Sequence, residues 1–364
     1  MSLHVSFEDE EKIFSDTVRK DSGSEDDITF SAEPFIIDNN ILEAYMGSDE
    51  KVIIPDGVTE IEGWAFANCK NITSVVIPES VKLIGDNAFK CCKNLKEVTL
   101  PNGLTEIGRG AFLKCESLTS IKIPESVIGL GDRVFYDCKN LTSVKIPQGV
   151  TGIGDYVFFG CTNLVSVEIP DTLTIIGSFA FKDCKRLTSV TIPNGVIGIG
   201  NFAFKNCISL KSAEVPESVK SIGVSAFENC SGITSVSLPN SLNKIGNYAF
   251  KNCSALSSVT VSNGTAKTDN DIHIRGSADI GLYAFGDCVN LSSVAIPDSI
   301  TEINIFAFEN CRSFTSVTIP KSVEKIGSFA FKDCESLTSV TIENGSAKIS
   351  SLAFRNCNNL VNKN

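Results

Sequence analysis

The sequence is poor in histidine, methionine and tryptophan, with two His, two Met and one Trp in 364 residues. His4 lies in an acidic N-terminal segment and His273 in an insertion, and neither has a companion nucleophile at a repeated spacing. Catalysis that depends on histidine is therefore not expected, and we predict that the chain is not an enzyme. The net charge of −11 also disfavours generic binding to nucleic acid.

Long apolar runs are absent as well. None approaches the roughly 18 residues of a membrane-spanning helix, so no such segment is expected. The first ten residues lack the basic start and apolar stretch of a secretory signal, so no signal is visible in this chain.

Residues 1–33 are strongly acidic. They contain ten acidic and three basic side chains, a net charge of −7, whereas the other 331 residues carry only −4. Such a polar segment buries too little apolar surface to offset the entropy of ordering it. We therefore predict that residues 1–33 are largely disordered.

From Pro55 to the C-terminus the chain consists of one repeated unit. Phenylalanine recurs every 23 residues from Phe66 to Phe250 and, after one step of 35, from Phe285 to Phe354, which makes thirteen copies. Proline keeps the same period from Pro55 to Pro239, and a cysteine follows each of these phenylalanines by three residues. The longer step places an insertion near residues 265–277.

One copy, residues 187–207, shows how the unit is expected to fold. Val190 and Ile192 alternate with polar residues, which is typical of a strand with one buried face, and Pro193 ends that strand. Asn201 stands where the cap of a short helical turn would lie, and Asn206 where the chain would turn out of it.

A single unit of this size cannot bury its own apolar residues, but stacked units can share a continuous core. We therefore predict a right-handed repeat solenoid of thirteen 23-residue coils, with short parallel strands and short helical turns. It should occupy residues 55–364. Residues 34–54 are expected to form a hairpin-like N-terminal cap.

The registers of Pro, Ile-Gly, Ala-Phe and Cys resemble the BspA-like leucine-rich repeats, also called the Treponema pallidum type, over residues 55–360. The resemblance implies a bacterial or protist surface protein that binds proteins of a host or of neighbouring cells. It also implies the leucine-rich-repeat form of the solenoid. Two alternatives stay open: a cytoplasmic or periplasmic scaffold, and a stalk that spaces another domain from the cell surface.

Two short patterns imitate cofactor or metal sites. Gly152-Ile-Gly154 and Gly198-Ile-Gly200 look like the start of a dinucleotide fingerprint, but each is one copy of the repeat. Asp269-Asn-Asp271-Ile-His273 suggests calcium or a transition metal, yet a calcium loop would need glycine where the chain has Ile274 and glutamate where it has Ile280. We expect no cofactor and no metal.

The best candidates for a partner-binding surface are outward residues of coils three to seven, where the repeat departs from its usual residues. One column of the strand is charged there, and exposed isoleucines replace the usual charges farther along the coil. Aromatic residues stand two positions before the repeated phenylalanine, where they could instead form an outer layer of the core. Contiguous apolar and aromatic surface is typical of protein recognition. The candidates are Lys122, Lys145, Glu168, Ile128, Ile175, Ile197, Tyr156, Phe179 and Phe202.

The fourteen cysteines are not expected to form disulfides. Thirteen of them would form one evenly spaced ladder, in which nothing pairs a thiol with one neighbour rather than the other. Buried cysteine serves as a small apolar side chain. Cys91 lies outside this ladder at the exit turn, so it should be the one exposed thiol.

Overall fold

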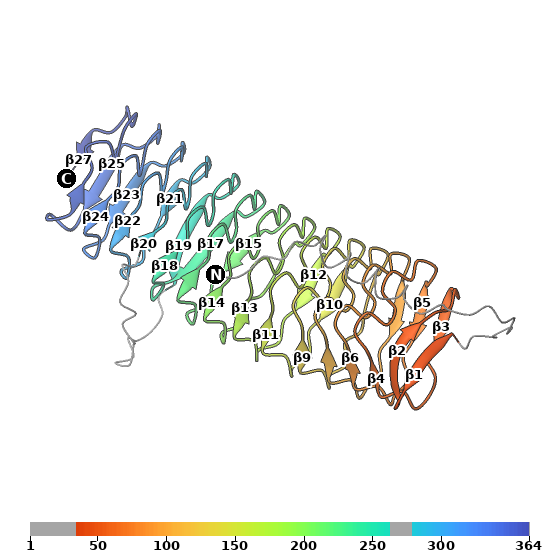
Figure 1. The fold of residues 1–364 in the computed structure, drawn as a ribbon. Coiled ribbons are helices and arrows are strands. Elements are labelled where there is room, and N and C mark those ends of the chain that lie inside the picture. The colour runs from red at the N-terminus through yellow and green to blue at the C-terminus, as the bar shows by residue number, and fades with distance from the viewer. Residues whose placement is uncertain (1–33, 263–278, 364) are drawn as a thin grey trace, which may run out of the picture. The chain divides into compact units, whose positions relative to one another are not determined.

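The computed structural model of the chain describes residues 34–262 and 279–363. The acidic segment (1–33) and the insertion (265–277), including its candidate calcium motif, lie outside the described residues. Phe35–Asn364 form one compact unit. This unit is a stack of successive coils (Figure 1). The coils are numbered one to thirteen below, each beginning at its proline position, so that coil one begins at Pro55 and coil four at Pro124.

Most coils add a strand to a first ladder, which lies just before or at the proline position, but no strand forms before Pro124 or Pro193. These strands are β3 (Lys51–Ile53), β5 (Ser74–Val76), β7 (Glu97–Thr99), β10 (Ser143–Lys145), β12 (Ser166–Glu168), β15 (Ser212–Glu214), β17 (Ser235–Pro239), β19 (Ser258–Ser262), β21 (Ser293–Val294), β23 (Ser316–Ile319), β25 (Ser339–Ile342) and β27 (Asn362–Lys363). They form four separate parallel sheets, β3-β5-β7, β10-β12, β15-β17-β19-β21 and β23-β25-β27.

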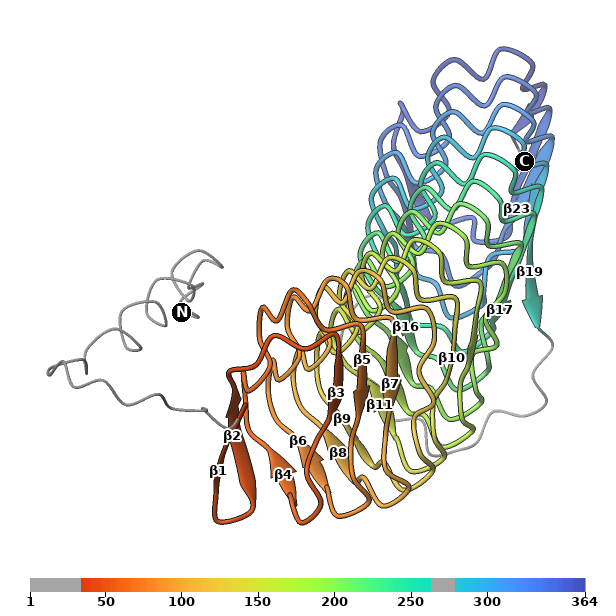
Figure 2. The same cartoon turned by 90° about the vertical axis from the view of Figure 1, so that its right-hand side faces the viewer.

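A second ladder of two-residue strands follows the proline. Its strands are β4 (Glu60–Ile61), β6 (Leu83–Ile84), β8 (Glu106–Ile107), β9 (Gly129–Leu130), β11 (Gly152–Ile153), β13 (Ile175–Ile176), β14 (Gly198–Ile199), β16 (Ser221–Ile222), β18 (Lys244–Ile245), β20 (Asp279–Ile280), β22 (Glu302–Ile303), β24 (Lys325–Ile326) and β26 (Lys348–Ile349). The nine strands from β11 to β26 form one parallel sheet. The two ladders lie on different sides of the coil (Figure 2).

A hairpin precedes the first coil. It consists of β1 (Phe35–Asp38) and β2 (Ile41–Tyr45), which pair antiparallel, and β2 then pairs parallel with β4. Its turn residues, Asn39 and Asn40, have φ angles of 48° and 64°, which asparagine tolerates better than most residues. The ring of Tyr45 stacks on that of Phe66 with their centroids 5.1 Å apart, so the hairpin contacts the core of coil one.

Stacked phenylalanines run through the core, as the repeat predicts. The ring of Phe204 has no solvent exposure and lies with its centroid 5.1 Å from those of both Phe181 and Phe227. The ring planes differ by only 4° and 8°. This confirms that the 23-residue period sets a residue-on-residue stack.

The strand predicted for residues 189–192 is wrong in its hydrogen bonding but right in its burial. No strand is formed there. Ser189 and Thr191 are nevertheless exposed, Val190 is half-buried and Ile192 is buried. The alternating pattern correctly predicts which side chains face the core. These residues keep that orientation although they do not form the strand hydrogen bonds of the first ladder.

The predicted short helical turns are also wrong, because the corner residues of the described coils form a chain of tight turns and no helix. Phe202 and Asn206 have φ angles of 59° and 64°, which a right-handed helix cannot contain. The amide of Lys205 donates to the carbonyl of Phe202 in its own coil (3.2 Å), whereas the amide of Phe202 donates to the carbonyl of Val224 in the next coil (2.8 Å). The corner thus divides its hydrogen bonds between its own coil and the next.

Asn201 does not act as a helix cap. Its Oδ1 accepts the amide of Val224 in the next coil at 2.8 Å. Asp155 likewise accepts the amide of Ser178 in the next coil at 2.6 Å. Side chains that were predicted to start a helix therefore join one coil to another.

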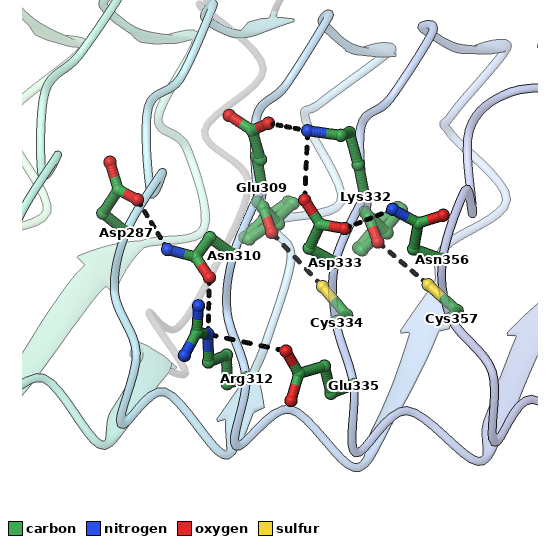
Figure 3. Close-up of polar contacts among 12 residues, drawn as sticks. Asp287, Glu309, Asn310, Arg312, Lys332, Asp333, Cys334, Glu335, Asn356 and Cys357 are labelled. Atoms are coloured by element: carbon green, nitrogen blue, oxygen red, sulfur yellow. Dashed lines mark hydrogen bonds and ion pairs between the residues drawn. The ribbon is translucent and has the colours of Figure 1, made fainter.

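The exit turn forms a ladder of amide and carboxylate side chains. The Asn310 amide donates to Asp287 at 2.8 Å, and the Asn356 amide donates to Asp333 at 2.6 Å (Figure 3). Lys332 bridges two neighbouring coils, because its Nζ lies 3.0 Å from Asp333 and also pairs with a glutamate of the preceding coil (Figure 3). The residues at this position have φ angles near +60°. Asn and Asp tolerate this left-handed conformation better than other residues with a side chain, and glycine adopts it freely, so these three types dominate the position.

All fourteen cysteines are free thiols. Each ladder thiol from Cys92 onward donates to the carbonyl of the repeated phenylalanine one coil earlier, as Cys334 does to Phe308 at 3.3 Å (Figure 3). Cys91 is half-buried, not exposed as predicted, and Cys69 and Cys357 at the ends of the ladder are half-buried too. The burial of a thiol therefore depends on the neighbouring coils that cover it, as well as on whether the residue lies in the exit turn.

Replacing Phe204 with alanine is expected to lower the free energy of unfolding by about 3–5 kcal/mol, because it empties one level of the stack. Since coils contact only their neighbours, unfolding should separate into two steps. Urea denaturation followed by circular dichroism measures both effects. Phe202→Ala, at a half-buried ring two residues away, is the control and should cost less. An unchanged midpoint for Phe204→Ala would contradict the stacked core.

The ladder thiols should make the protein sensitive to alkali. Burial raises the pKa of ten thiols above the usual range: Cys92, Cys115, Cys138, Cys161, Cys184, Cys207, Cys230, Cys253, Cys288 and Cys311. In the unfolded chain a thiol ionises at a pH of about 8.5. The stability that these groups contribute is therefore complete below that pH and is lost as the pH rises above it.

Urea midpoints measured under reductant from pH 7 to 10.5 test this expectation. The free energy of unfolding should fall steeply above pH 8.5, and the double variant Cys184→Ala/Cys207→Ala should show a shallower fall. Equal slopes for the variant and the wild type would rule out the thiols as the cause.

Candidate functional site

The charged candidates lie on the outward face of the first ladder. Lys145 ends β10 and Glu168 ends β12, and the two are direct partners across the parallel pair. Lys122 occupies the equivalent position one coil earlier, where only an isolated bridge joins Ser120 to Ser143. All three candidate side chains are exposed. Lys145 also forms an ion pair with Glu125, its Nζ lying 2.6 Å from the carboxylate.

The isoleucine candidates lie on the second ladder. Ile175 is the first residue of β13 and is 52% exposed, whereas Ile176 beside it has no exposure. Ile128 and Ile197 directly precede β9 and β14, and they are 67% and 62% exposed. The prediction that these three side chains point outward is confirmed.

The nine candidates do not form one surface. Inward residues of both ladders, such as Val144 of β10 and Ile176 of β13, belong to the same core. The outward residues of the two ladders therefore point away from each other, as the separate positions of the ladders indicate (Figure 2). Lys122, Lys145 and Glu168 share neighbouring coils with the isoleucines, which is why one surface was expected, but each coil turns between the two positions.

The aromatic candidates form a column beside the second ladder. The ring of Phe179 stacks on Tyr156 and on Phe202, with centroid distances of 4.5 and 4.7 Å. All three residues are half-buried and have φ angles near 60°, a conformation that is unusual for bulky side chains. Because the rings cover one another's faces, mainly their edges face solvent. The column is therefore both an outer layer of the core and a surface.

Two further aromatic residues enlarge this cluster and were missed in the sequence analysis. Phe159 stacks on Tyr136 at 4.6 Å and approaches Tyr156 at 5.9 Å. Both stand one residue after the repeated phenylalanine, a position that is charged in most copies. The aromatic substitution in two successive copies was the signal that could have identified them.

Cations lie over two of the rings of the aromatic cluster. The Lys182 ammonium is 4.8 Å from the centroid of Phe159, and the Arg133 guanidinium is 5.1 Å from that of Tyr156. Burial raises the pKa of Tyr136 and that of Tyr156, so both phenols remain protonated hydrogen-bond donors at neutral pH. The cluster thus offers ring edges, hydroxyl groups and positive charge to a ligand.

The exposed isoleucines belong to a strip of the second ladder that carries no charge. This isoleucine strip comprises Ile128, Gly129, Thr151, Gly152, Thr174, Ile175, Ile197 and Gly198 of coils four to seven. Ile175 pairs in register with Gly152 on one side and Gly198 on the other. A Cβ on Gly152 would lie 3.0 Å from Cγ2 of Ile175, so the isoleucine leans over the space that the glycine leaves.

Other kinds of site find little support in the parts of the chain that the structure describes. Within residues 34–262 and 279–363 no three His, Cys, Asp or Glu side chains group in a way that could hold a metal ion. No helix within these ranges has the length and hydropathy needed to cross a bilayer.

Comparison with known proteins identifies relatives of the whole repeat array. A family model for the BspA type leucine rich repeat region matches residues 36–165, 151–277 and 278–364. A leucine-rich repeat protein from Bacteroides ovatus is 29% identical over 88% of both chains, with a TM-score of 0.67. A leucine rich cell surface protein from Faecalibacterium prausnitzii is 30% identical over 88% of this chain and 96% of its own, with a TM-score of 0.53. The curated proteins that were compared contain no match.

Changing Ile128, Ile175 and Ile197 together to lysine should leave the fold and its stability almost unchanged, because exposed substitutions usually change stability by less than about 0.5 kcal/mol. Ile176→Lys is the matched control, since it puts the same charge one residue away but into the core, and it should unfold the neighbouring coils. Circular dichroism and thermal melting compare the two. Unfolding of the triple variant would show that these side chains belong to the core.

Proposed function

The chain belongs to the BspA-type leucine-rich-repeat family, and we propose that it is a non-enzymatic protein–protein interaction module, displayed on a bacterial cell surface as an adhesin-like protein. The repeat fold is a scaffold of the interaction type, and no catalytic family matches the chain. The surface location is supported by the F. prausnitzii relative, which is described as a cell surface protein.

The observation that carries the proposal is the partly aromatic surface of coils four to seven, in which the isoleucine strip itself carries no charge. These coils carry three isoleucines that are more than half exposed and five half-buried aromatic rings. Large aromatic and aliphatic side chains supply most of the binding energy at protein interfaces when a partner excludes water from them. The aromatic rings and their cations would add polar contacts at the border of this apolar strip.

The charged residues of the first ladder have a weaker claim to partner binding. The outward side chains of that ladder are mostly serine and threonine in the later coils, and Lys145 is already paired with Glu125. Exposed ion pairs of this kind contribute little energy. We therefore propose the second ladder and the aromatic cluster as the main contact surface, and Lys122, Lys145 and Glu168 as a separate, minor one.

A photoreactive phenylalanine analogue at position 175 should crosslink to surface proteins of epithelial cells or of neighbouring bacteria. The same analogue at Ile53, which is 73% exposed on the first ladder, is the matched control and should not. Unlabelled wild-type protein should compete for the crosslinked partner, whereas the variant with lysine at 128, 175 and 197 should not. A variant with lysine at 53, 76 and 99, which changes the charge equally on the other ladder, should still compete. Equal crosslinking from both positions would contradict the proposed surface.

A further inference from the structure

The second ladder is interrupted at one place within the described coils. Strands β1, β2, β4, β6, β8 and β9 form one sheet and the nine strands from β11 to β26 form another, so β9 of coil four does not pair with β11 of coil five. At the next junction the amides of Thr174 and Gly177 donate to coil five at 2.9 and 2.8 Å. The equivalent amides one coil earlier, those of Thr151 and Gly154, donate to no carbonyl of coil four.

The main chains of coils four and five are also farther apart at the corner that follows this ladder. A Cβ on Gly177 would lie 2.6 Å from a main-chain carbon of Gly154, and one on Gly200 would lie 2.5 Å from Gly177. A Cβ on Gly154 would approach the main chain of coil four no closer than 3.5 Å, at the Cα of Asp132. The Asp132 carboxylate lies in this gap and accepts the amide of Asp155 at 2.8 Å.

The phenylalanine stack is loosest on the two sides of coil four. The ring centroid of Phe135 lies 5.9 Å from that of Phe112 and 5.6 Å from that of Phe158, whereas the other steps of the stack from Phe66 to Phe354 measure 4.8–5.3 Å. The amides of Phe112 and Phe135 donate to the next coil at 3.0 and 2.9 Å, against 2.7 or 2.8 Å for the other repeated phenylalanines. The core is therefore widened where the second ladder is interrupted.

Three departures from the repeat account for the widening. Val134 and Val157 stand directly before the repeated phenylalanine, where every other copy has alanine. Both valines are fully buried, and extra methyl groups in a packed core force the neighbouring main chain to shift. Leu130 is the single leucine at the inward position of the second ladder. It is half-buried, whereas its isoleucine equivalents from Ile61 to Ile326 are buried.

The first ladder holds the same junction closed. Strand β10 of coil four pairs with β12 of coil five over three residues, and the ring of Phe159 stacks on Tyr136 across the junction at 4.6 Å. Where the first ladder has no strand, before Pro124 and Pro193, the opposite arrangement is found, because the second ladder runs on through those coils. Coils four and five are thus joined on the first-ladder side and open on the other.

We propose that the junction between coils four and five is a hinge, at which the second-ladder side opens and closes about the intact first ladder. In the closed form β9 pairs with β11, and the amides of Thr151 and Gly154 donate to coil four as their equivalents do elsewhere. The structure shows the open form. The two parts that keep a continuous second ladder move as rigid bodies, namely the hairpin with coils one to four and the stack of coils five to thirteen.

The hinge divides the isoleucine strip. Ile128 lies on coil four, on one side of the hinge, whereas Ile175 and Ile197 lie on the other. Closing brings Ile128 nearer to Ile175 and opening separates them, so the strip changes its length when the stack bends. The hinge itself is a property of the stacked coils and does not depend on the proposed function.

Hydrogen exchange of the main-chain amides, measured by NMR on the whole chain, tests the open junction. The amides of Thr151 and Gly154 should exchange at least about a hundredfold faster than those of Thr174 and Gly177, because only the latter two are bonded to the preceding coil. Equal protection of the two pairs would show that β9 and β11 are paired in solution, and it overturns the proposal.

Spin labels measure the bending. They are attached through p-acetylphenylalanine, which leaves the native thiols untouched, at Glu106 in coil three and Ser221 in coil eight, both exposed. The control pair joins Ser221 to the exposed Lys348 in coil thirteen, equally many coils away but wholly within the nine-stranded sheet. Pulsed electron paramagnetic resonance should give a distance distribution at least about twice as wide for the pair across the hinge. Equal widths overturn the proposal.

The triple variant Leu130→Ile/Val134→Ala/Val157→Ala restores the residues of the other copies and should close the hinge. Exchange at Thr151 and Gly154 should slow to within about tenfold of the equivalent amides one coil later, and the distance distribution should narrow to that of the control pair. A folded triple variant that keeps the wild-type exchange and width overturns the assignment of the hinge to these residues. If the variant does not fold, the two wild-type measurements still decide whether the hinge exists.

A matched variant separates the hinge from a general effect of core size. Val196→Ala/Val219→Ala makes the same valine-to-alanine change at two fully buried residues of coils seven and eight, where the second ladder is continuous. It should leave the distance distribution across the hinge as wide as in the wild type. Narrowing by this variant as well would contradict the role of Val134 and Val157.

Discussion

Every coil must lie on the next with residue over residue, because the main chain of each coil completes its hydrogen bonds on its neighbours. At the corner, the amide of Phe202 donates to the coil that follows while that of Lys205 donates within its own coil. A shift by one residue would exchange these roles and turn core side chains outward. The stacked phenylalanines, the thiols bound to carbonyls and the asparagine ladder all follow from this one constraint.

The corner of every coil but the last has two residues with φ near +60°. Asn, Asp and one Gly fill one of these positions in all coils but two, where Cys91 and Lys114 stand, and they reduce its cost; aromatic residues fill the other in most coils. A left-handed conformation costs about 1–2 kcal/mol for an ordinary residue. Ring stacking, worth about 0.5–1.5 kcal/mol for each pair, offsets much of it. The exposed aromatic edges are therefore a product of the fold before they are a binding surface.

Function in such a stack can vary only on the outward columns, because the inward ones are held by their neighbours above and below. Coils four to seven use this freedom by replacing the usual charges with isoleucine, glycine and threonine. The apolar strip costs the fold little, since its side chains project into solvent. It leaves an apolar surface that gains from being covered.

The sequence alone determined the period, the burial of Phe204 and its equivalents, and the outward orientation of Ile128, Ile175 and Ile197, because side-chain burial follows directly from a repeated pattern. It did not reveal the second ladder, whose two-residue strands are too short to show any alternation. It predicted helical turns and a capping role for Asn201, because the partners that decide the corner lie 22 residues away for the main chain of Phe202 and 23 for the Asn201 side chain, and leave no local signal. Only the tertiary structure placed Lys145 and Ile175 on different faces and half-covered Cys91. Both outcomes depend on how the coil bends and what its neighbours cover, and these are properties of the stack.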